Sequence, residues 1–158
     1  MTRTPQERKE RLARYETGSS AVEAAVAGAS DAELDLQPPT GWTARQVVHH
    51  VADSETMAYT RLRRLLADDE PVVIQGYDEP TWARRLHYDR PIDASLAVVR
   101  AVRTASLDLL RALTAEEWTR RGVHSESGEY SVDTWLDIYA EHSHDHADQI
   151  RRARRGED

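Results

Sequence analysis

Residues 131–150 read SVDTWLDIYAEHSHDHADQI, and their apolar residues recur at intervals of three and four. This period is typical of an amphipathic α-helix. Ser131 is a favourable N-cap, so the pattern predicts a helix from Val132 to about Arg155. The side of this helix that we expect to be buried comprises Trp135, Ile138, Tyr139, Ile150 and Ala153.

Three more amphipathic segments precede this helix. Capping boxes at 4–7 (TPQE) and 43–46 (TARQ) mark the start of helices expected over about 5–28 and 44–67. A third helix is expected over about 92–113. The apolar stripe of the second helix comprises Val47, Val51, Ala58, Leu62 and Leu65, and that of the third comprises Leu96, Val99, Val102, Leu107 and Leu110.

The segments between the helices carry few strand signals. Residues 68–91 are polar and contain three prolines, which predicts a long irregular crossover between the second and third helices. Within it PVVI (71–74) is a possible strand fragment without a clear partner, and RRGVHSESGEY (120–130) is expected to be a loop. The pattern therefore predicts an all-α fold, a four-helix bundle.

The composition is that of one globular domain spanning residues 1–158, with 39% hydrophobic and 31% charged residues. The chain has no cysteine, which excludes disulfides, thiolate metal sites and cysteine nucleophiles. No apolar run approaches the ~20 residues of a membrane span, and we expect a cytoplasmic protein. The net charge of −7 argues against nucleic acid as a partner.

Three of the seven histidines lie at alternate positions in residues 142–146. At ~100° per residue, His142 and His146 fall on the buried side of the last helix, whereas His144 falls on the opposite side. In the second helix His50 lies at the edge of the apolar stripe, and His49 points away from it. One inward histidine is therefore expected to face an inward pair on another helix.

A divalent metal ion would satisfy three buried imidazoles that have no other partners. The sequence thus predicts a metal site at His50, His142 and His146, and two histidines one turn apart are the spacing found in helical H-E-x-x-H sites. The alternative is that the pair consists of core histidines bonded to neighbouring tyrosines or carboxylates. His87 and His124 are expected to be solvated loop residues.

The other histidines and the nearby acids are not expected to contribute. His49 and His144 should lie on helix surfaces. No general base stands out, because Asp53, Glu55 and Glu141 lie off the inward face or at its edge. A catalytic residue is therefore not assigned.

The stretches GWTARQVVHHVADSE (41–55), YDEPTWA (77–83) and SGEYSVDTWLDIYAEHSHDHADQI (127–150) resemble the DinB-like, YfiT-type family of bacterial four-helix bundles. The resemblance covers nearly the whole chain. It implies that His50, His142 and His146 bind zinc or nickel, and that the protein is a homodimer. Leu66 and Leu136, at the margins of the apolar stripes, are candidates for that contact. Glu141, His144 and Asp145 depart from the family pattern beside the histidine pair.

Three histidines leave a coordination position open on the ion, as in catalytic zinc sites. We therefore expect a metal-dependent enzyme acting on a small molecule, either a hydrolase or an S-transferase. The family resemblance suggests a low-molecular-weight thiol, which would be a cosubstrate because the chain has no cysteine. The alternatives are a metal-dependent small-molecule binding or stress-response protein without turnover, and a metal that only stabilises the fold.

Overall fold

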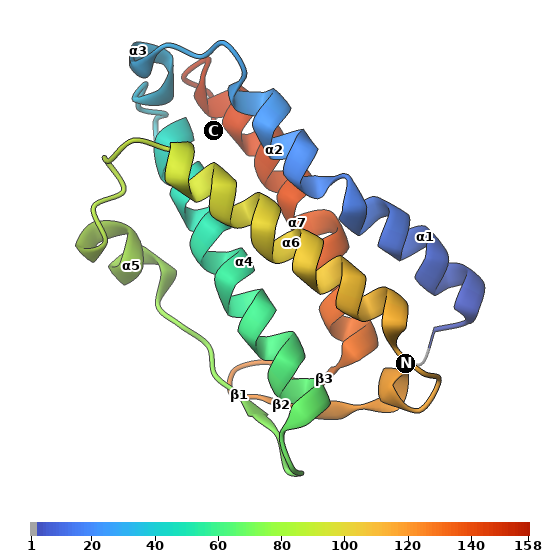
Figure 1. Ribbon diagram of the computed structural model, residues 1–158. Coiled ribbons are helices and arrows are strands. Elements are labelled where there is room, and N and C mark those ends of the chain that lie inside the picture. Colours follow the sequence, from blue (N-terminus) through green and yellow to red (C-terminus); the bar gives the residue numbers. More distant parts are fainter. Residues whose placement is uncertain (1–2) are drawn as a thin grey trace.

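The computed structural model describes residues 3–158, which form a bundle of four long helical rods (Figure 1). The first rod consists of two helices in line, and the other three are single helices. This confirms the predicted all-α four-helix bundle with a long crossover between its second and third rods. The helices are α1 (Pro5–Glu16), α2 (Gly18–Val26), α3 (Asp31–Leu34), α4 (Ala44–Ala67), α5 (Glu79–Arg85), α6 (Asp93–Ala112) and α7 (Val132–Ala153), with a 3₁₀ turn η1 (Glu117–Thr119).

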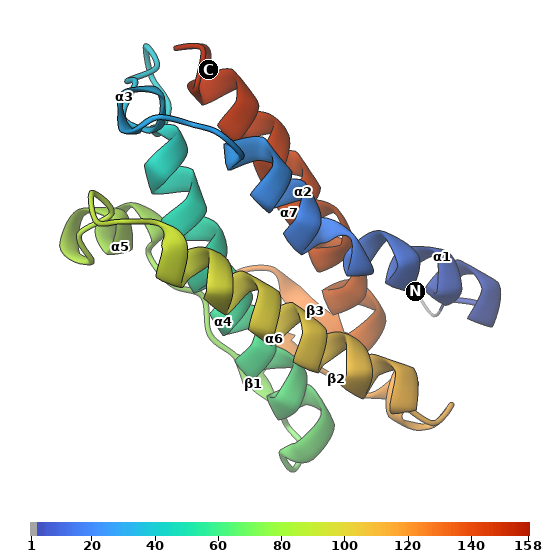
Figure 2. The same ribbon diagram turned by 45° about the horizontal axis from the view of Figure 1, so that its top comes forward.

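Helix α7 packs against α1, α2 and α4, and α6 packs on the other side of the same helices (Figure 2). Helices α6 and α7 therefore lie diagonally opposite each other in the bundle. The buried residues of α4 include all five positions of its predicted stripe. Trp135 of α7 is fully buried, and its indole Nε1 donates a hydrogen bond to the carbonyl of Ala58 on α4 at 2.8 Å. The contact between α4 and α7 brings the histidine-bearing helices together.

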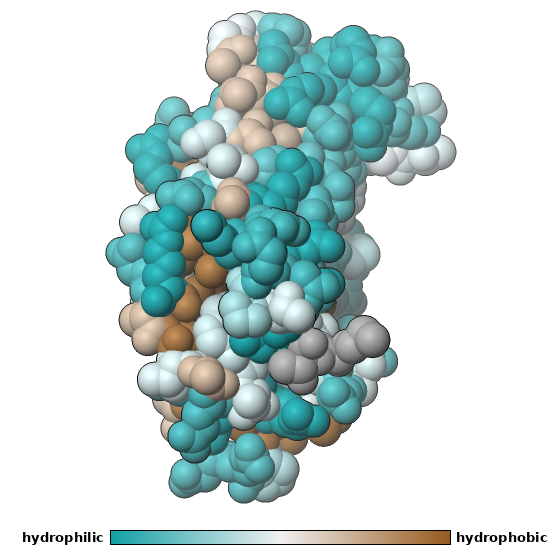
Figure 3. All heavy atoms as spheres, turned by 90° about the vertical axis from the view of Figure 1, so that its right-hand side faces the viewer, coloured by the Kyte–Doolittle hydropathy of each residue, from teal (hydrophilic) through white to brown (hydrophobic). Residues whose placement is uncertain are grey.

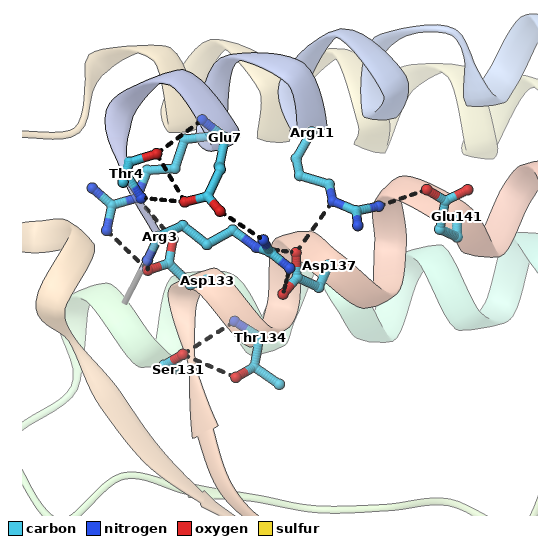
Figure 4. Close-up of polar contacts among 10 residues, drawn as sticks. Arg3, Thr4, Glu7, Arg11, Ser131, Asp133, Thr134, Asp137 and Glu141 are labelled. Atoms are coloured by element: carbon cyan, nitrogen blue, oxygen red, sulfur yellow. Dashed lines mark hydrogen bonds and ion pairs between the residues drawn. The ribbon is translucent and has the colours of Figure 1, made fainter. Parts of the chain in front are cut away.

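The start of each long helix follows its local sequence. Thr4, Thr43 and Ser131 all accept hydrogen bonds as N-caps, as predicted. Figure 4 shows how the N-terminal segment is then fixed to α7: the guanidinium of Arg3 contacts Asp137 at 2.6 Å and that of Arg11 contacts Glu141 at 2.6 Å. These ion pairs align α1 along α7.

The first helix is not continuous over 5–28 as predicted, because it is interrupted at Thr17. Side chains from other helices form hydrogen bonds with the backbone carbonyl groups at this point. Arg103 of α6 donates to the carbonyl of Tyr15, and His144 of α7 lies 3.0 Å from the carbonyl oxygen of Arg14. Gly18 allows this approach, since a Cβ there would lie 2.4 Å from Arg103 Nη2.

Two segments expected to be irregular pair with each other. The crossover contains β1 (Val73–Ile74) and α5, and residues 120–130 form a hairpin of β2 (Arg121–His124) and β3 (Gly128–Ser131) rather than a loop. Strand β1 pairs in parallel with β2, and β2 pairs antiparallel with β3. The partner of the PVVI fragment thus lies about 50 residues later in the chain.

Two predictions for α7 are wrong, namely that Ile138 is buried and that Leu136 lies at the margin of the apolar stripe. Ile138 is 43% exposed, whereas Leu136 is completely buried beside Trp135 and is not available for contact with a second copy. The homodimer therefore stays a prediction. The face of α1 is mainly hydrophilic, with one apolar strip (Figure 3).

Among residues 3–158, no helix has both the length and the apolar character needed to cross a bilayer. The cytoplasmic location and the absence of nucleic acid stay predictions.

Replacing Gly122 with alanine should destabilise the fold by roughly 1–3 kcal/mol, because a Cβ there would lie 2.5 Å from the carbonyl oxygen of Val72 across the β1–β2 pair. Backbone on both sides leaves little freedom to relax. Urea denaturation measures the effect. Gly41→Ala is the control, since its Cβ would meet the nearest atom at 3.4 Å, and equal stability of the two variants would contradict the expectation.

Candidate metal centre

Helices α4 and α7 bring three imidazole rings together. His50 projects from α4, and His142 and His146 project from successive turns of α7. One nitrogen of each ring lies within 4.8 Å of the others. The ring centroids of His142 and His146 are 4.4 Å apart, and that of His50 lies 4.7 Å from His146 and 5.7 Å from His142. These are the three residues that the sequence singled out.

The surroundings keep all three rings neutral. Burial lowers the pKa of His50 to about 3, with a further contribution from His146. Burial also lowers the pKa of His142 well below its ordinary value, as do His146, His50 and Arg103, and burial lowers that of His146. A neutral imidazole has a free lone pair, which is the form that binds a metal ion.

The hydrogen bonding of the rings also fits a metal ion. Nδ1 of His50 and Nδ1 of His142 are buried without a hydrogen-bond partner among residues 3–158. Nδ1 of His146 lies 2.7 Å from Oε1 of Gln149, so this nitrogen donates and Nε2 keeps the lone pair. Buried nitrogens without partners are costly, and a divalent cation would satisfy several of them at once.

Two of the three acids near the histidines are occupied elsewhere. Asp53 accepts a hydrogen bond from the hydroxyl of Tyr88 at 2.6 Å, and Glu141 pairs with Arg11 and Arg14. Neither is placed to act on a molecule at the triad.

Glu55 contradicts the expectation that it lies off the inward face. It is 1% exposed, and its Oε1 accepts hydrogen bonds from Arg103 and from the hydroxyl of Ser143. The same Oε1 lies 3.9 Å from Nδ1 of His142. The signal was present in the sequence, because Glu55 is four residues after Val51 and three before Ala58, on the stripe itself. Arg103 sits on the stripe of α6 in the same way, four residues after Val99.

His49 is not a surface residue, which corrects the prediction. It is fully buried, with Nδ1 2.8 Å from the hydroxyl of Ser95 and Nε2 2.9 Å from the carbonyl oxygen of Arg90. Tyr88 stacks on the same ring at 5.5 Å between centroids. His49 thus ties α4 to the end of the crossover and to α6, and it does not join the triad.

The remaining histidines also lie outside the triad. His144 is half-buried rather than solvated, since it contacts the carbonyl of Arg14 and the hydroxyl of Thr17 at the break between α1 and α2. His124 is buried in β2, which contradicts the expectation of a solvated loop residue. His87 is exposed, as expected.

Two cavities border the triad, and one of them touches only His142. The larger, of about 530 Å³, is lined by all three histidines together with Trp42, Glu79 and Gln149. The smaller, of about 210 Å³, lies on the other side of His142. Glu79 and His142 line both cavities. Glu79 belongs to the stretch YDEPTWA (77–83) that resembles the family, but its position beside the triad could not be predicted, because the path of the crossover depends on distant contacts.

A four-helix bundle that holds a histidine triad between its second and fourth rods defines the class of this protein. The chain belongs to the DinB superfamily, whose sequence pattern matches residues 14–150. The fold is similar to that of YfiT from Bacillus subtilis, with a TM-score of 0.89 and 29% identity over 98% of this chain and 89% of that one. YfiT is described as "a probable metal-dependent hydrolase with an unusual four-helix bundle topology".

Two relatives carry the words metal-dependent hydrolase in their names. A protein of Oceanobacillus iheyensis is 41% identical over 110 residues, which are 70% of this chain and 63% of the relative. A protein of Bacillus cereus is 34% identical over 115 residues, which are 73% of this chain and 66% of the relative. The chain therefore spans slightly less than two thirds of the length of these relatives.

Proposed function

We propose that the protein is a metal-dependent enzyme in which His50, His142 and His146 hold one divalent ion, zinc or nickel. The observation that carries this proposal is the convergence of three neutral imidazoles beside a cavity of about 530 Å³. The names of the relatives and of YfiT support it. A site with three protein ligands and an adjoining cavity has the character of a catalytic rather than a structural metal centre.

The expected reaction is hydrolysis of a small molecule or transfer of a low-molecular-weight thiol to one. A bound divalent ion supplies Lewis-acid chemistry, which makes either water or a thiol a better nucleophile near neutral pH. The absence of cysteine means that a thiol would enter as a cosubstrate. A cavity of about 530 Å³ has a size typical of sites for small molecules.

Glu79 is the group that we propose moves the proton. It is the carboxylate that lines the larger cavity, and within residues 3–158 it makes no hydrogen bond or ion pair that would occupy it. Partial burial raises its pKa, Arg61 opposes this change and Glu126 adds to it. Its carboxylate would accept the proton of the nucleophile and return it to the leaving group.

The test is metal analysis of untagged protein, followed by two assays with and without a chelator. One assay follows conjugation of L-cysteine to monobromobimane, and the other follows hydrolysis of p-nitrophenyl acetate. We expect about one ion per chain and activity in at least one assay that is lost with the metal. Failure to retain metal after loading would overturn the proposal, and unchanged activity after its removal would exclude a catalytic ion. Metal-free protein that unfolds would instead indicate a structural ion.

Glu79→Gln should retain the metal and lower the rate of the metal-dependent reaction roughly 100-fold or more. The amide cannot accept the proton, but it preserves the size of the side chain. Glu129→Gln is the control, because Glu129 borders a different cavity. An unchanged rate in the Glu79 variant would remove Glu79 from the mechanism without affecting the metal site.

A further inference from the structure

The smaller cavity beside His142 contains charges that do not pair. Arg61, Glu79 and Glu126 all line it, and no ion pair between them is formed within the part of the chain that the structure describes. Opposite charges that face one small cavity without contact leave room for a charged group of each sign. A volume of about 210 Å³ is large enough for the polar end of a small molecule.

The same cavity presents hydrogen-bond donors that are not used. Arg61 donates from Nη1 to the hydroxyl of Tyr139 at 3.0 Å and from Nη2 to the carbonyl of Gln75 at 2.9 Å. Its Nε is buried without a partner among the described residues, as is the hydroxyl of Tyr77. Buried donors without partners are rare in folded proteins and call for a ligand or water.

His124 provides a further donor. Its Nδ1 accepts a hydrogen bond from the backbone N–H of Glu126 at 3.2 Å. Burial lowers the pKa of His124, so the ring is neutral and its proton lies on Nε2. Arg61 and His124 thus offer two donors suited to a carboxylate.

Glu126 lies at the tip of the β2–β3 hairpin, close to Gly76 of the crossover. A Cβ at Gly76 would lie 2.4 Å from the carboxyl group of Glu126, so glycine lets this side chain lie against the crossover. The backbone N–H of Gly76 also donates to the hydroxyl of Ser125 at 3.0 Å. The absence of a side chain at position 76 therefore leaves room for the Glu126 carboxylate beside the crossover.

We propose that this cavity binds the zwitterionic end of an amino-acid-like substrate or cosubstrate. The carboxylate of the ligand lies against Arg61 and His124, its ammonium group lies against Glu126, and its reactive group reaches the triad past His142. This inference rests on the proposed metal centre, because the triad supplies the reacting position. It specifies the class of small molecule that the enzyme takes.

The test uses cobalt-loaded protein and three thiols as probes, because a thiolate bound to cobalt gives a visible charge-transfer band. The thiols are L-cysteine, its methyl ester, which lacks the carboxylate, and mercaptopropionate, which lacks the ammonium group. Each is titrated into the wild type and into Arg61→Gln and Glu126→Gln. Arg121→Gln and Glu129→Gln serve as controls, since both residues border the cavity at the other end of the hairpin.

Arg61→Gln should weaken the binding of L-cysteine and of mercaptopropionate roughly tenfold or more and leave the binding of the methyl ester nearly unchanged. Glu126→Gln should weaken the binding of L-cysteine and of the methyl ester by a similar factor and leave the binding of mercaptopropionate nearly unchanged. Each thiol is compared with itself across the variants, so differences among the three thiols in intrinsic affinity for cobalt cancel. Equal effects on all three thiols, or no band with any of them, would overturn the subsite and leave the metal centre standing. Protein that takes up no cobalt would overturn the metal centre itself.

Discussion

His142→Ala should abolish metal binding and any metal-dependent activity, whereas His144→Ala should retain both. The ring centroid of His142 lies 4.4 Å from that of His146 and 5.7 Å from that of His50, and the residue borders both cavities. Removing one of three ligands should cost more affinity than the roughly 10–100-fold lost with an outer partner. Metal content per chain after loading and desalting measures the difference.

The His144 variant should show a different defect. Its ring bonds the carbonyl of Arg14 and the hydroxyl of Thr17, so alanine should lower the free energy of unfolding by about 1 kcal/mol. Urea denaturation of both metal-free variants measures this effect. If the His144→Ala variant lost the metal and the His142→Ala variant kept it, the proposed ligand set would be wrong.

Arg103→Met should lower the free energy of unfolding by roughly 3–5 kcal/mol, because it leaves the carboxylate of Glu55 buried without its partner. Arg103 is 3% exposed, donates to Glu55 and to the carbonyls of Tyr15 and Tyr139, and lies over the ring of Tyr15 at 3.8 Å. Urea denaturation of the metal-free protein gives the change without a contribution from ligand binding.

Arg100→Met is the matched control on the same helix. Arg100 pairs with Glu23 at 2.6 Å, but its side chain is 64% exposed, and surface pairs contribute only about 0–1 kcal/mol. Similar losses at positions 100 and 103 would show that the buried pair adds no more to stability than a surface pair.

Features set by nearby residues could be predicted from the sequence. Thr4, Thr43 and Ser131 cap helices through bonds to residues three positions away, and His142 and His146 share a face because they are four residues apart. The convergence of the three histidines needed only one further assumption, that the helix carrying His50 packs against theirs.

Features that depend on distant partners could not be predicted. The β1–β2 pairing joins segments about 50 residues apart, and the break at Thr17 is stabilised by Arg103 and His144. The sequence predicts a surface position for His49, because the apolar period of its own helix identifies only the side that faces the bundle. The crossover covers the other side, through Arg90 and Tyr88.

The crossover and the hairpin are joined by strand pairing into one appendage at the side of the bundle, which supplies half of the residues around the smaller cavity, Glu79 and Glu126 among them. The triad, by contrast, resides wholly on α4 and α7. The three histidines and the residues that would bind the ammonium group of a ligand thus lie on separate parts of the chain. Grafting residues 124–127 from another member of the superfamily should change which molecules are accepted and leave the histidine triad and Glu79 in place. Such a division lets a family diversify its chemistry by exchanging short inserts on a constant scaffold.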